Sequence, residues 1–367
     1  MKKINVLYIV PSLNVSDGIT SYAMNYFRAV KNVNIDFLIT STTENTVICD
    51  EVRKAGHKVF FIQSNSIKKL FSSLKQIDNF YLENSNNYDI VHCHVASLGA
   101  PFLYYARKHG VKHRILHTHA TVSADTLSHR IRNDITSIFT KLLATNYAAC
   151  SHAAGKALFN NKEYKLIRNG IDIKSFEFNN DIRKEYRNKL GFDNKFIIGN
   201  IGRLSYQKNQ KYLIKIAEKL VDFTTNFQIV LIGNGELESS LKEDVHEKNL
   251  DKYFVFLGLR KDVKNIYNAM DLFVLPSNFE GLPVVGVEAQ SNGLKCIFST
   301  NITREIDLSK NSSFIDIDEK STANWCNEIL TQMKIKSINR YFNSMVSYDV
   351  NECAKELEDY YFKLLCD

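Results

Sequence analysis

The 367-residue sequence is poor in glycine, proline and tryptophan. It contains 15 Gly, 4 Pro and one Trp, and so few Gly and Pro argue against a long flexible linker. Its seven Cys are odd in number and form no Cys-x-x-Cys pair. This pattern excludes a disulfide framework and favours free thiols in a reducing cytoplasm.

Long apolar runs are also missing. No run reaches the roughly 18 residues that a membrane-spanning helix needs. The first apolar run, Ile4–Val10, contains Asn5 and ends at Pro11, which suits a buried strand better than a signal peptide. We therefore expect a cytoplasmic protein that associates, if at all, with the inner face of the membrane as a peripheral protein.

Positive charge is in excess, and it is unevenly placed. The net charge is +7, and residues 1–173 hold 21 Lys and Arg against 12 Asp and Glu, a net +9. A basic half favours anionic partners such as phosphates or anionic lipid. Nucleic acid is not an expected partner, because no recognised binding motif accompanies the charge.

One basic segment, residues 66–77, is amphipathic. Most such faces pack on a sheet, whereas some lie on anionic membranes. Both interpretations stay open, and an anionic membrane surface is an expected partner. The apolar residues on one helical face are Ile67, Leu70, Phe71, Leu74 and Ile77, beside Lys68, Lys69 and Lys75.

Short apolar runs alternate with helical patterns along the whole chain. Runs that are apolar at every position are typical of strands in parallel sheets, and their alternation with helices predicts βαβ units. The expected strands are 4–10, 36–39, 58–62, 89–92, 114–117, 147–149 and 165–167, then 196–200, 228–232, 255–257, 272–275 and 295–298.

The sequence therefore predicts an α/β protein of two Rossmann-like, doubly wound parallel-sheet domains that face each other across a cleft. Such sheets bind ligands beyond the carboxyl ends of their strands. The expected domains are residues 1–173 and 174–349, with a last helix at about 350–367 that packs back on the first domain. The polar stretch 172–194 is the expected hinge.

The strongest candidate site runs from Glu280 to Glu288, after an expected strand. Pro283 suits the first turn of a helix, and such a helix would direct backbone N–H groups at a phosphate. Glu280 could accept hydrogen bonds from sugar hydroxyls, and Glu288 could chelate a pair of ribose hydroxyls. The candidate donor contacts in this segment are Gly281, Leu282, Pro283, Val284 and Glu288.

Two glutamates eight positions apart that bracket Gly281-Leu282-Pro283 resemble the donor motif of family 4 glycosyltransferases. That family has the GT-B fold and includes bacterial capsular and exopolysaccharide enzymes. The resemblance implies that the N-terminal domain takes the acceptor and the C-terminal domain takes the nucleotide sugar. The plain alternative is a helix that starts at Pro and carries one exposed Glu.

Arg203 and Lys208 follow Gly202 between an expected strand and a helix. Paired cations there could bind a diphosphate, and the resemblance implies that they neutralise the leaving nucleotide diphosphate. Two solvated surface cations are the alternative for either residue alone.

Three weaker signals complete the donor side. The Gly233 turn lacks the third glycine of a dinucleotide fingerprint, and the resemblance makes it a wall of the donor pocket. Leu259 and Arg260 would flank the nucleobase, as in similar enzymes, or belong to a surface turn. Gly18 matches the second glycine of a pair found in the family, and Asp17 stands in place of the first, with its role open.

Histidines cluster at the ends of two expected strands, at His92, His94, His113, His117 and His119. The resemblance places a His after the second of these strands, beside the transferred sugar, and His119 is the candidate. His117 is interpreted as a packed strand residue, and His94 as lining the acceptor side. A structural zinc site is disfavoured, because it would need better-spaced Cys and His sets.

The resemblance implies a retaining, metal-independent transfer from a nucleotide sugar, with a UDP-sugar as the expected donor. No Asp-x-Asp motif stands at a strand end to hold Mg²⁺, and no cofactor is expected beyond the nucleotide sugar, which is a substrate. The expected acceptor is a saccharide or lipid-linked saccharide in surface-polysaccharide synthesis. The catalytic candidates are His119, Arg203, Lys208 and Glu280.

Three other functions are weighed. An NAD-dependent oxidoreductase would need a full glycine fingerprint after the first strand, which is absent. A sugar-nucleotide epimerase of similar fold would share the donor contacts without an acceptor. A catalytically inactive scaffold would have no need of both glutamates together with Arg203 and Lys208.

Overall fold

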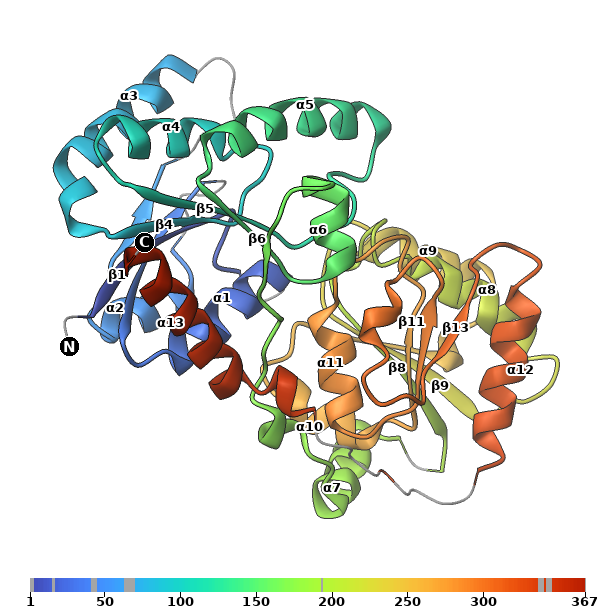
Figure 1. Ribbon diagram of the computed structural model, residues 1–367. Helices are drawn as coiled ribbons and strands as arrows, with labels where there is room; N and C mark the ends of the chain where they lie inside the picture. The colour runs from blue at the N-terminus through green and yellow to red at the C-terminus, as the bar shows by residue number, and fades with distance from the viewer. Residues whose placement is uncertain are drawn as a thin grey trace. The chain divides into compact units, whose positions relative to one another are not determined.

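The computed structural model (Figure 1) describes residues 3–14, 17–40, 45–62, 70–192, 194–335, 340 and 345–366. By its internal contacts the chain divides into two units, Met1–Gly170 with Ser347–Asp367, and Ile171–Val346. Each unit is built on one parallel sheet, so the prediction of two doubly wound parallel sheets is confirmed. Residues 66–69 of the amphipathic basic segment lie outside the described residues.

The described part of the first unit contains a seven-stranded sheet of order β3-β2-β1-β4-β5-β6-β7. The order reverses between β1 and β4, which is where such sheets bind ligands. The strands are β1 (Ile4–Val10), β2 (Val33–Ile39), β3 (Val59–Phe61), β4 (Ile90–Cys93), β5 (His113–Thr118), β6 (Asn146–Ala149) and β7 (Lys165–Leu166). The helices are α1 (Gly18–Ala29), α2 (Val47–Lys54), α3 (Leu70–Asn84), α4 (Ala100–Lys108), α5 (Leu127–Leu143), α6 (His152–Phe159) and α13 (Val350–Cys366).

Helices cover both faces of this sheet (Figure 1), and an apolar core lies on each face. On one face, Tyr8 packs with residues of α1 and with Tyr361 of α13. On the other face, Leu7 packs with Ile77 of α3 and Phe102 of α4. Neighbouring residues of β1 are therefore buried on opposite sides, which explains why the run is apolar at nearly every position.

The described part of the second unit contains a six-stranded parallel sheet of order β10-β9-β8-β11-β12-β13, which reverses between β8 and β11. The strands are β8 (Phe196–Ile201), β9 (Phe227–Ile232), β10 (Phe254–Gly258), β11 (Leu272–Leu275), β12 (Cys296–Ser299) and β13 (Ser313–Ile315). The helices are α7 (Asn180–Leu190), α8 (Lys211–Leu220), α9 (Glu238–Glu247), α10 (Val263–Ala269), α11 (Val284–Ser291) and α12 (Thr322–Met333).

The stretch 172–194, the expected hinge, contains the helix α7. Its Arg183 and Arg187 both bind Asp271, with N–O distances of 2.5 and 3.1 Å. Both arginines are largely buried, and the Asp271 carboxylate pairs with charges that would otherwise be buried without a partner. The polar residues therefore anchor a helix to the start of β11.

Among the described residues, no helix is long and apolar enough to cross a bilayer.

Candidate functional site

Three of the predicted residues, Lys208, Glu280 and Glu288, come together in the second unit. The loop that carries Lys208 follows β8, and the loop that carries Glu280 follows β11. These are the two strands between which the sheet order reverses. The carboxyl ends of such a strand pair form the usual ligand site of an open α/β sheet.

Glu280 is 5% exposed and accepts three hydrogen bonds. Lys208 Nζ donates to Oε1 at 2.7 Å, and Ser277 Oγ donates to the same oxygen at 2.9 Å. Gln207 Nε2 donates to Oε2 at 3.2 Å. A buried carboxylate needs such partners, because an unpaired charge away from water is costly. The surrounding loops thus hold Glu280 in a fixed orientation.

Glu288 lies on α11, and its carboxylate Oε2 accepts a hydrogen bond from the Tyr267 hydroxyl at 2.8 Å. Burial raises the pKa of Glu288 to about 7, while the Tyr267 hydrogen bond and the positive charge of Lys208 act in the opposite direction. Lys208 therefore donates a hydrogen bond to Glu280 and lowers the pKa of Glu288 through its charge. At neutral pH, Glu288 is close to the midpoint of its titration.

The backbone beside Lys208 requires glycine at two positions. Gly202 has φ +151°, and a Cβ there would lie 3.0 Å from Lys208 Cε. Gly233 has φ +132°, and a Cβ there would lie 2.1 Å from the Gly202 carbonyl oxygen. Gly202 thus leaves room for the Lys208 side chain, and Gly233 lets the loops after β8 and β9 pack together.

The start of α11 differs by one position from the prediction. Pro283 is the residue before the helix, with φ −70° and ψ 120°, and Val284 is the first helical residue. Leu282 and Val284 are buried, and Gly281 precedes them in the loop after β11. The segment from Gly281 to Val284 therefore forms the N-terminal approach to α11, as the sequence indicates.

Arg203, Leu259 and Arg260 lie apart from this cluster in the contacts of the described residues. The Arg203 side chain is 51% exposed, and Glu236 lies 3.9 Å away. Leu259 is 52% exposed. Arg260 donates two hydrogen bonds to Asp262, at 2.9 and 2.7 Å. Arg260 thus stabilises its own turn, which is the alternative that the sequence left open.

Asp17 and Gly18 begin α1 of the first unit. Asp17 is the N-cap, and its Oδ1 accepts a hydrogen bond from the Ile19 backbone N–H at 3.0 Å. Its other oxygen accepts a hydrogen bond from Ser12 Oγ at 3.0 Å. A Cβ at Gly18 would meet no atom within 4 Å. Asp17 therefore has a capping role, and the backbone at Gly18 is open to close approach.

The structure brings four histidines of the first unit together at the carboxyl ends of β4 and β5, with His92 and His117 inside the strands and His94 and His119 just after them. His94 Nδ1 and His119 Nε2 are 2.9 Å apart, and His92 Nε2 and His117 Nδ1 are 3.1 Å apart. The rings of His117 and His119 stack with centroids 4.1 Å apart. The two residues therefore lie on the same side, although β5 ends at Thr118.

Burial keeps these histidines neutral. It lowers the pKa of His119 to about 3 and depresses the pKa values of His92, His94 and His117 well below the ordinary value. No acidic side chain contacts the four rings among the described contacts. At neutral pH the cluster can therefore donate and accept hydrogen bonds, but it carries no positive charge.

Two tyrosines that the sequence analysis did not single out complete the histidine cluster. Tyr361 of α13 places its hydroxyl 2.5 Å from His92 Nδ1. Tyr22 of α1 packs its ring against His94, His117 and His119. Tyr361 lies 269 positions from His92 in the chain, so no local pattern could reveal the contact.

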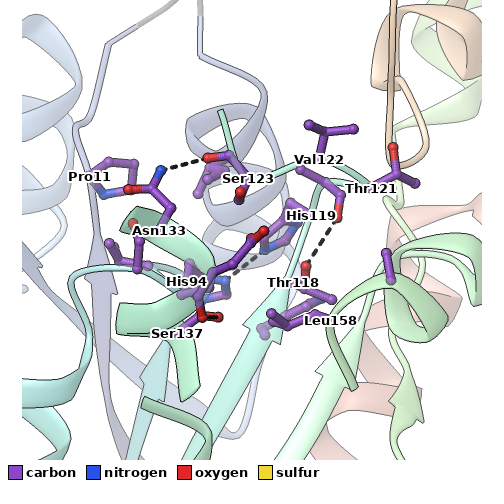
Figure 2. Close-up of a pocket in the computed structure, with 18 residues that line it drawn as sticks. Pro11, His94, Thr118, His119, Thr121, Val122, Ser123, Asn133, Ser137 and Leu158 are labelled. Carbon is purple, nitrogen blue, oxygen red and sulfur yellow. Dashed lines mark hydrogen bonds between the residues drawn. The ribbon is translucent and has the colours of Figure 1, made fainter. Parts of the chain in front are cut away.

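The imidazole rings of His94 and His119 line a pocket of about 270 Å³ within the first unit. Figure 2 shows them beside polar side chains from β5, α5 and the loop between these two elements. Asn133 Nδ2 donates a hydrogen bond to the Ser123 carbonyl oxygen at 2.7 Å. The pocket thus offers hydroxyl, amide and imidazole groups that can exchange hydrogen bonds with a polar ligand. Its polar lining includes Ser97, Thr118, Thr121, Ser123, Asn133, Asp134 and Ser137.

Ligand atoms of His92, His94 and His117 lie within 4.8 Å of one another, close enough to converge on a metal ion. Both nitrogens of His92 already have hydrogen-bond partners, Tyr361 and His117. Binding a cation through His92 would therefore break one of these bonds. The geometry fits a hydrogen-bonded cluster better than a set of convergent ligands.

Comparison with known proteins agrees with this architecture. Residues 182–308 match the family model described as "Glycosyl transferases group 1". The chain is 30% identical over 312 residues to the putative glycosyltransferase EpsF of Bacillus subtilis, covering 82% of this chain and 80% of EpsF. It is 34% identical over 326 residues to the Escherichia coli UDP-Gal:alpha-D-GlcNAc-diphosphoundecaprenol alpha-1,3-galactosyltransferase, covering 84% of this chain and 82% of that enzyme.

The fold is also similar to that of solved structures. Anabaena HepE, solved in complex with UDP, superposes with a TM-score of 0.77 at 17% identity, covering 98% of this chain and 99% of HepE. At this identity the similarity concerns the fold alone. Together with the sequence relatives, it shows that the chain belongs to the group 1 glycosyltransferases, family 4, with the GT-B fold, and is a nucleotide-sugar glycosyltransferase.

Proposed function

We propose that the protein is a retaining, metal-independent glycosyltransferase that moves a sugar from a UDP-sugar to a saccharide or lipid-linked saccharide in surface-polysaccharide synthesis. The observation that carries the proposal is the cluster of Lys208, Glu280 and Glu288 where the second sheet reverses its order. The E. coli relative, named for a UDP-Gal donor and a diphosphoundecaprenol acceptor, supports the choice of both substrates.

In this proposal, Lys208 and Arg203 stabilise the negative charge of the leaving diphosphate. Preorganised cations stabilise charge that develops in a transition state. Lys208 is fixed by Glu280, whereas Arg203 is exposed and can adjust to the donor. The turns at Gly202 and Gly233, the start of α11 from Gly281, and the exposed Leu259 then form the remaining donor contacts. Arg260 serves by shaping its turn through Asp262.

Glu280 and Glu288 hold the two sugars of the donor in this proposal. Glu280 accepts hydrogen bonds from the transferred sugar, and its three existing donors keep it oriented for this role. Glu288 chelates the ribose hydroxyls, which requires its ionised form. The raised pKa of Glu288 thus makes donor binding depend on pH near neutrality.

We place the acceptor in the polar pocket of the first unit and His119 beside the transferred sugar. The neutral His119 ring, held by His94 at 2.9 Å, would orient a sugar hydroxyl by hydrogen bonding. Gly18, at the open start of α1, remains a proposed contact of the donor phosphate or the acceptor.

The experiment is a panel of UDP-sugars, other nucleotide sugars and NAD, with binding read as a thermal shift of the purified protein. We expect a UDP-sugar to stabilise the protein by several degrees. Turnover with a lipid-linked acceptor should then give a product whose anomeric configuration, read by NMR, matches the donor. Stabilisation by NAD alone would refute the proposal.

An epimerase and an inactive scaffold are separated by the same assay. An epimerase would alter the nucleotide sugar without an acceptor, and a scaffold would bind it without any product. Addition of EDTA should leave turnover unchanged, and loss of turnover that Mg²⁺ restores would contradict the metal-independent mechanism.

A further inference from the structure

Helix α5 of the first unit has its apolar side turned to solvent. Its buried side chains are Ser137 and Thr140. A helix of a soluble domain normally turns its apolar side to the core, so α5 has the reverse arrangement. The exposed side, called here the α5 stripe, consists of Leu127 (72% exposed), Ile131 (54%), Ile135 (54%), Ile138 (49%), Phe139 (56%) and Leu142 (69%).

Close packing holds α5 in this orientation. A Cβ at Gly99, the residue before α4, would lie 2.8 Å from Thr140 Cγ2. The side of α5 that faces α4 therefore accommodates only small residues. Rotation of the helix to bury the stripe would place Ile135 or Phe139 where Thr140 now fits, so the exposure of the stripe is built into the fold.

Neighbouring helices also expose aromatic side chains. Helices α3, α4 and α5 lie in one layer on the same face of the sheet (Figure 1). Tyr104 of α4 is 52% exposed, and Phe71 of α3 is 86% exposed. Apolar patches on this scale are typical of interaction surfaces.

Cations border the α5 stripe on both sides. At 100° per residue, Arg132 falls beside one edge of the stripe, and Arg130 and Lys141 fall beside the other. Asp134 is the one acidic residue in the helix sequence. Helix α4 adds Arg107, whereas Lys108 is paired with Asp78 of α3 at 2.9 Å. An apolar stripe between cations is the pattern of helices that lie in the interface of an anionic bilayer.

We propose that the α5 stripe docks on an anionic phospholipid bilayer, with its apolar side chains among the acyl chains and its cations at the head groups. This inference rests on the proposed function, because docking would bring the protein to the surface where a lipid-linked acceptor lies. Helix α5 also contributes Asn133, Asp134 and Ser137 to the acceptor pocket. Docking of the stripe therefore places the pocket next to the lipid surface.

The charge distribution favours lipid over a second copy of the chain. If two copies met through the α5 stripe about a twofold axis, each would bring the cations of its own α5 to the shared interface. The helix sequence has three Lys and Arg against one Asp, so like charges would face one another there. An anionic surface pairs these cations instead.

The test is co-sedimentation of the full chain with vesicles of 70% phosphatidylcholine and 30% phosphatidylglycerol, without donor or acceptor. The test variant is Ile131→Glu with Phe139→Glu, since neither residue lines the acceptor pocket. The matched control is Phe223→Glu, at a 61% exposed position of the second unit. We expect wild type and control to bind equally, and the double variant to bind at least tenfold more weakly. Wild type should also bind vesicles of pure phosphatidylcholine at least tenfold more weakly.

Equal binding by the double variant, or binding that ignores anionic lipid, would overturn the proposal. It would also be overturned if the wild type were a dimer by sedimentation equilibrium, the double variant a monomer, and neither bound vesicles. Thermal unfolding checks that the variants fold, and Ile131→Ser with Phe139→Ser replaces the Glu pair if they do not. Because the assay needs no sugar transfer, vesicle binding by a protein inactive with every UDP-sugar would refute the proposed reaction alone.

Discussion

Each unit carries a titratable cluster near the carboxyl ends of two neighbouring parallel strands, β8 and β11 in the second unit and β4 and β5 in the first, but the two clusters avoid an unpaired buried charge in different ways. The second unit pairs its carboxylates with Lys208, a hydroxyl and an amide. The first unit collects four histidines with no buried counter-ion among their contacts, and burial keeps these histidines neutral. One site is thus prepared for charge on the ligand, and the other for neutral hydrogen bonding.

The largest effect should come from breaking the charged cluster. Lys208→Ala should lower kcat/KM by about 10³-fold, because the diphosphate loses its fixed cation and Glu280 loses its ion pair. The matched control is Lys211→Ala, which removes a 67% exposed cation that pairs with Asp244 in the same unit. Steady-state kinetics checks the prediction, and equal losses in both variants would contradict it.

A change in the neutral cluster should have a smaller effect and leave the pH profile intact. His119→Gln should lower kcat/KM by roughly 10- to 100-fold, since one oriented hydrogen bond to the sugar is altered. The pH profile between 5 and 8 should keep its shape, because the pKa of His119, about 3, lies below that range. Loss of a limb from the profile in this variant would show that His119 titrates during catalysis.

Glu288 should make donor binding stronger as the pH rises through about 7. Its ionised fraction increases about tenfold between pH 6 and pH 8 for a pKa near 7, and the ribose hydroxyls need the carboxylate. Calorimetry of UDP binding should show a change of that size in Kd. In Glu288→Gln the dependence should vanish, and an unchanged dependence would assign it to another group.

The raised pKa of Glu288 also makes the folded protein less stable as the pH rises, whereas it makes donor binding stronger. A carboxyl group whose pKa is higher in the folded state stabilises the fold below its unfolded pKa, and this contribution is lost as the pH rises through the folded value. The free energy of unfolding of Glu288→Gln, relative to that of wild type, should therefore increase from pH 5 to pH 8 by up to about 3 kcal/mol. Urea unfolding at both pH values measures the difference, and a constant difference would contradict the burial of an ionisable Glu288.

Removal of one hydroxyl from the neutral cluster should have the smallest effect. Tyr361→Phe loses the contacts with His92 at 2.5 Å and with the Tyr8 hydroxyl at 3.1 Å. We expect destabilisation by about 1–2 kcal/mol, with kcat/KM changed less than threefold. A large loss of turnover at unchanged stability would give α13 a direct part in the chemistry.

Sequence periodicity predicted the sheets because strands buried on both faces are apolar at nearly every position. The expected strands Ile4–Val10 and Leu272–Leu275 agree with β1 and β11 at both ends. The short edge strand β13 was missed, since only three half-buried residues form it. The alternation of strands and helices implies a helix between the expected strands 114–117 and 147–149, where α5 lies. The outward orientation of its apolar side could not be predicted, because it depends on the packing against α4.

The candidate site was predictable where residues follow strand ends. Lys208 and Glu280 meet because β8 and β11 are neighbours in the sheet. The pairing of Arg260 with Asp262 and the role of Asp17 as a helix cap depend on side-chain geometry that spacing does not specify. The partners Tyr267 and Tyr361 come from other helices, and tertiary packing alone brings them to Glu288 and His92.

The central claim is that Lys208 binds the nucleotide diphosphate, between the two donor sugars that Glu280 and Glu288 hold. The most direct measurement is calorimetric titration of UDP and UMP into wild type, Lys208→Ala and Lys211→Ala. We predict that wild type and Lys211→Ala bind UDP at least tenfold more tightly than UMP, and that Lys208→Ala loses this preference. If Lys208→Ala binds UDP as tightly as wild type, the donor diphosphate does not lie at this cluster.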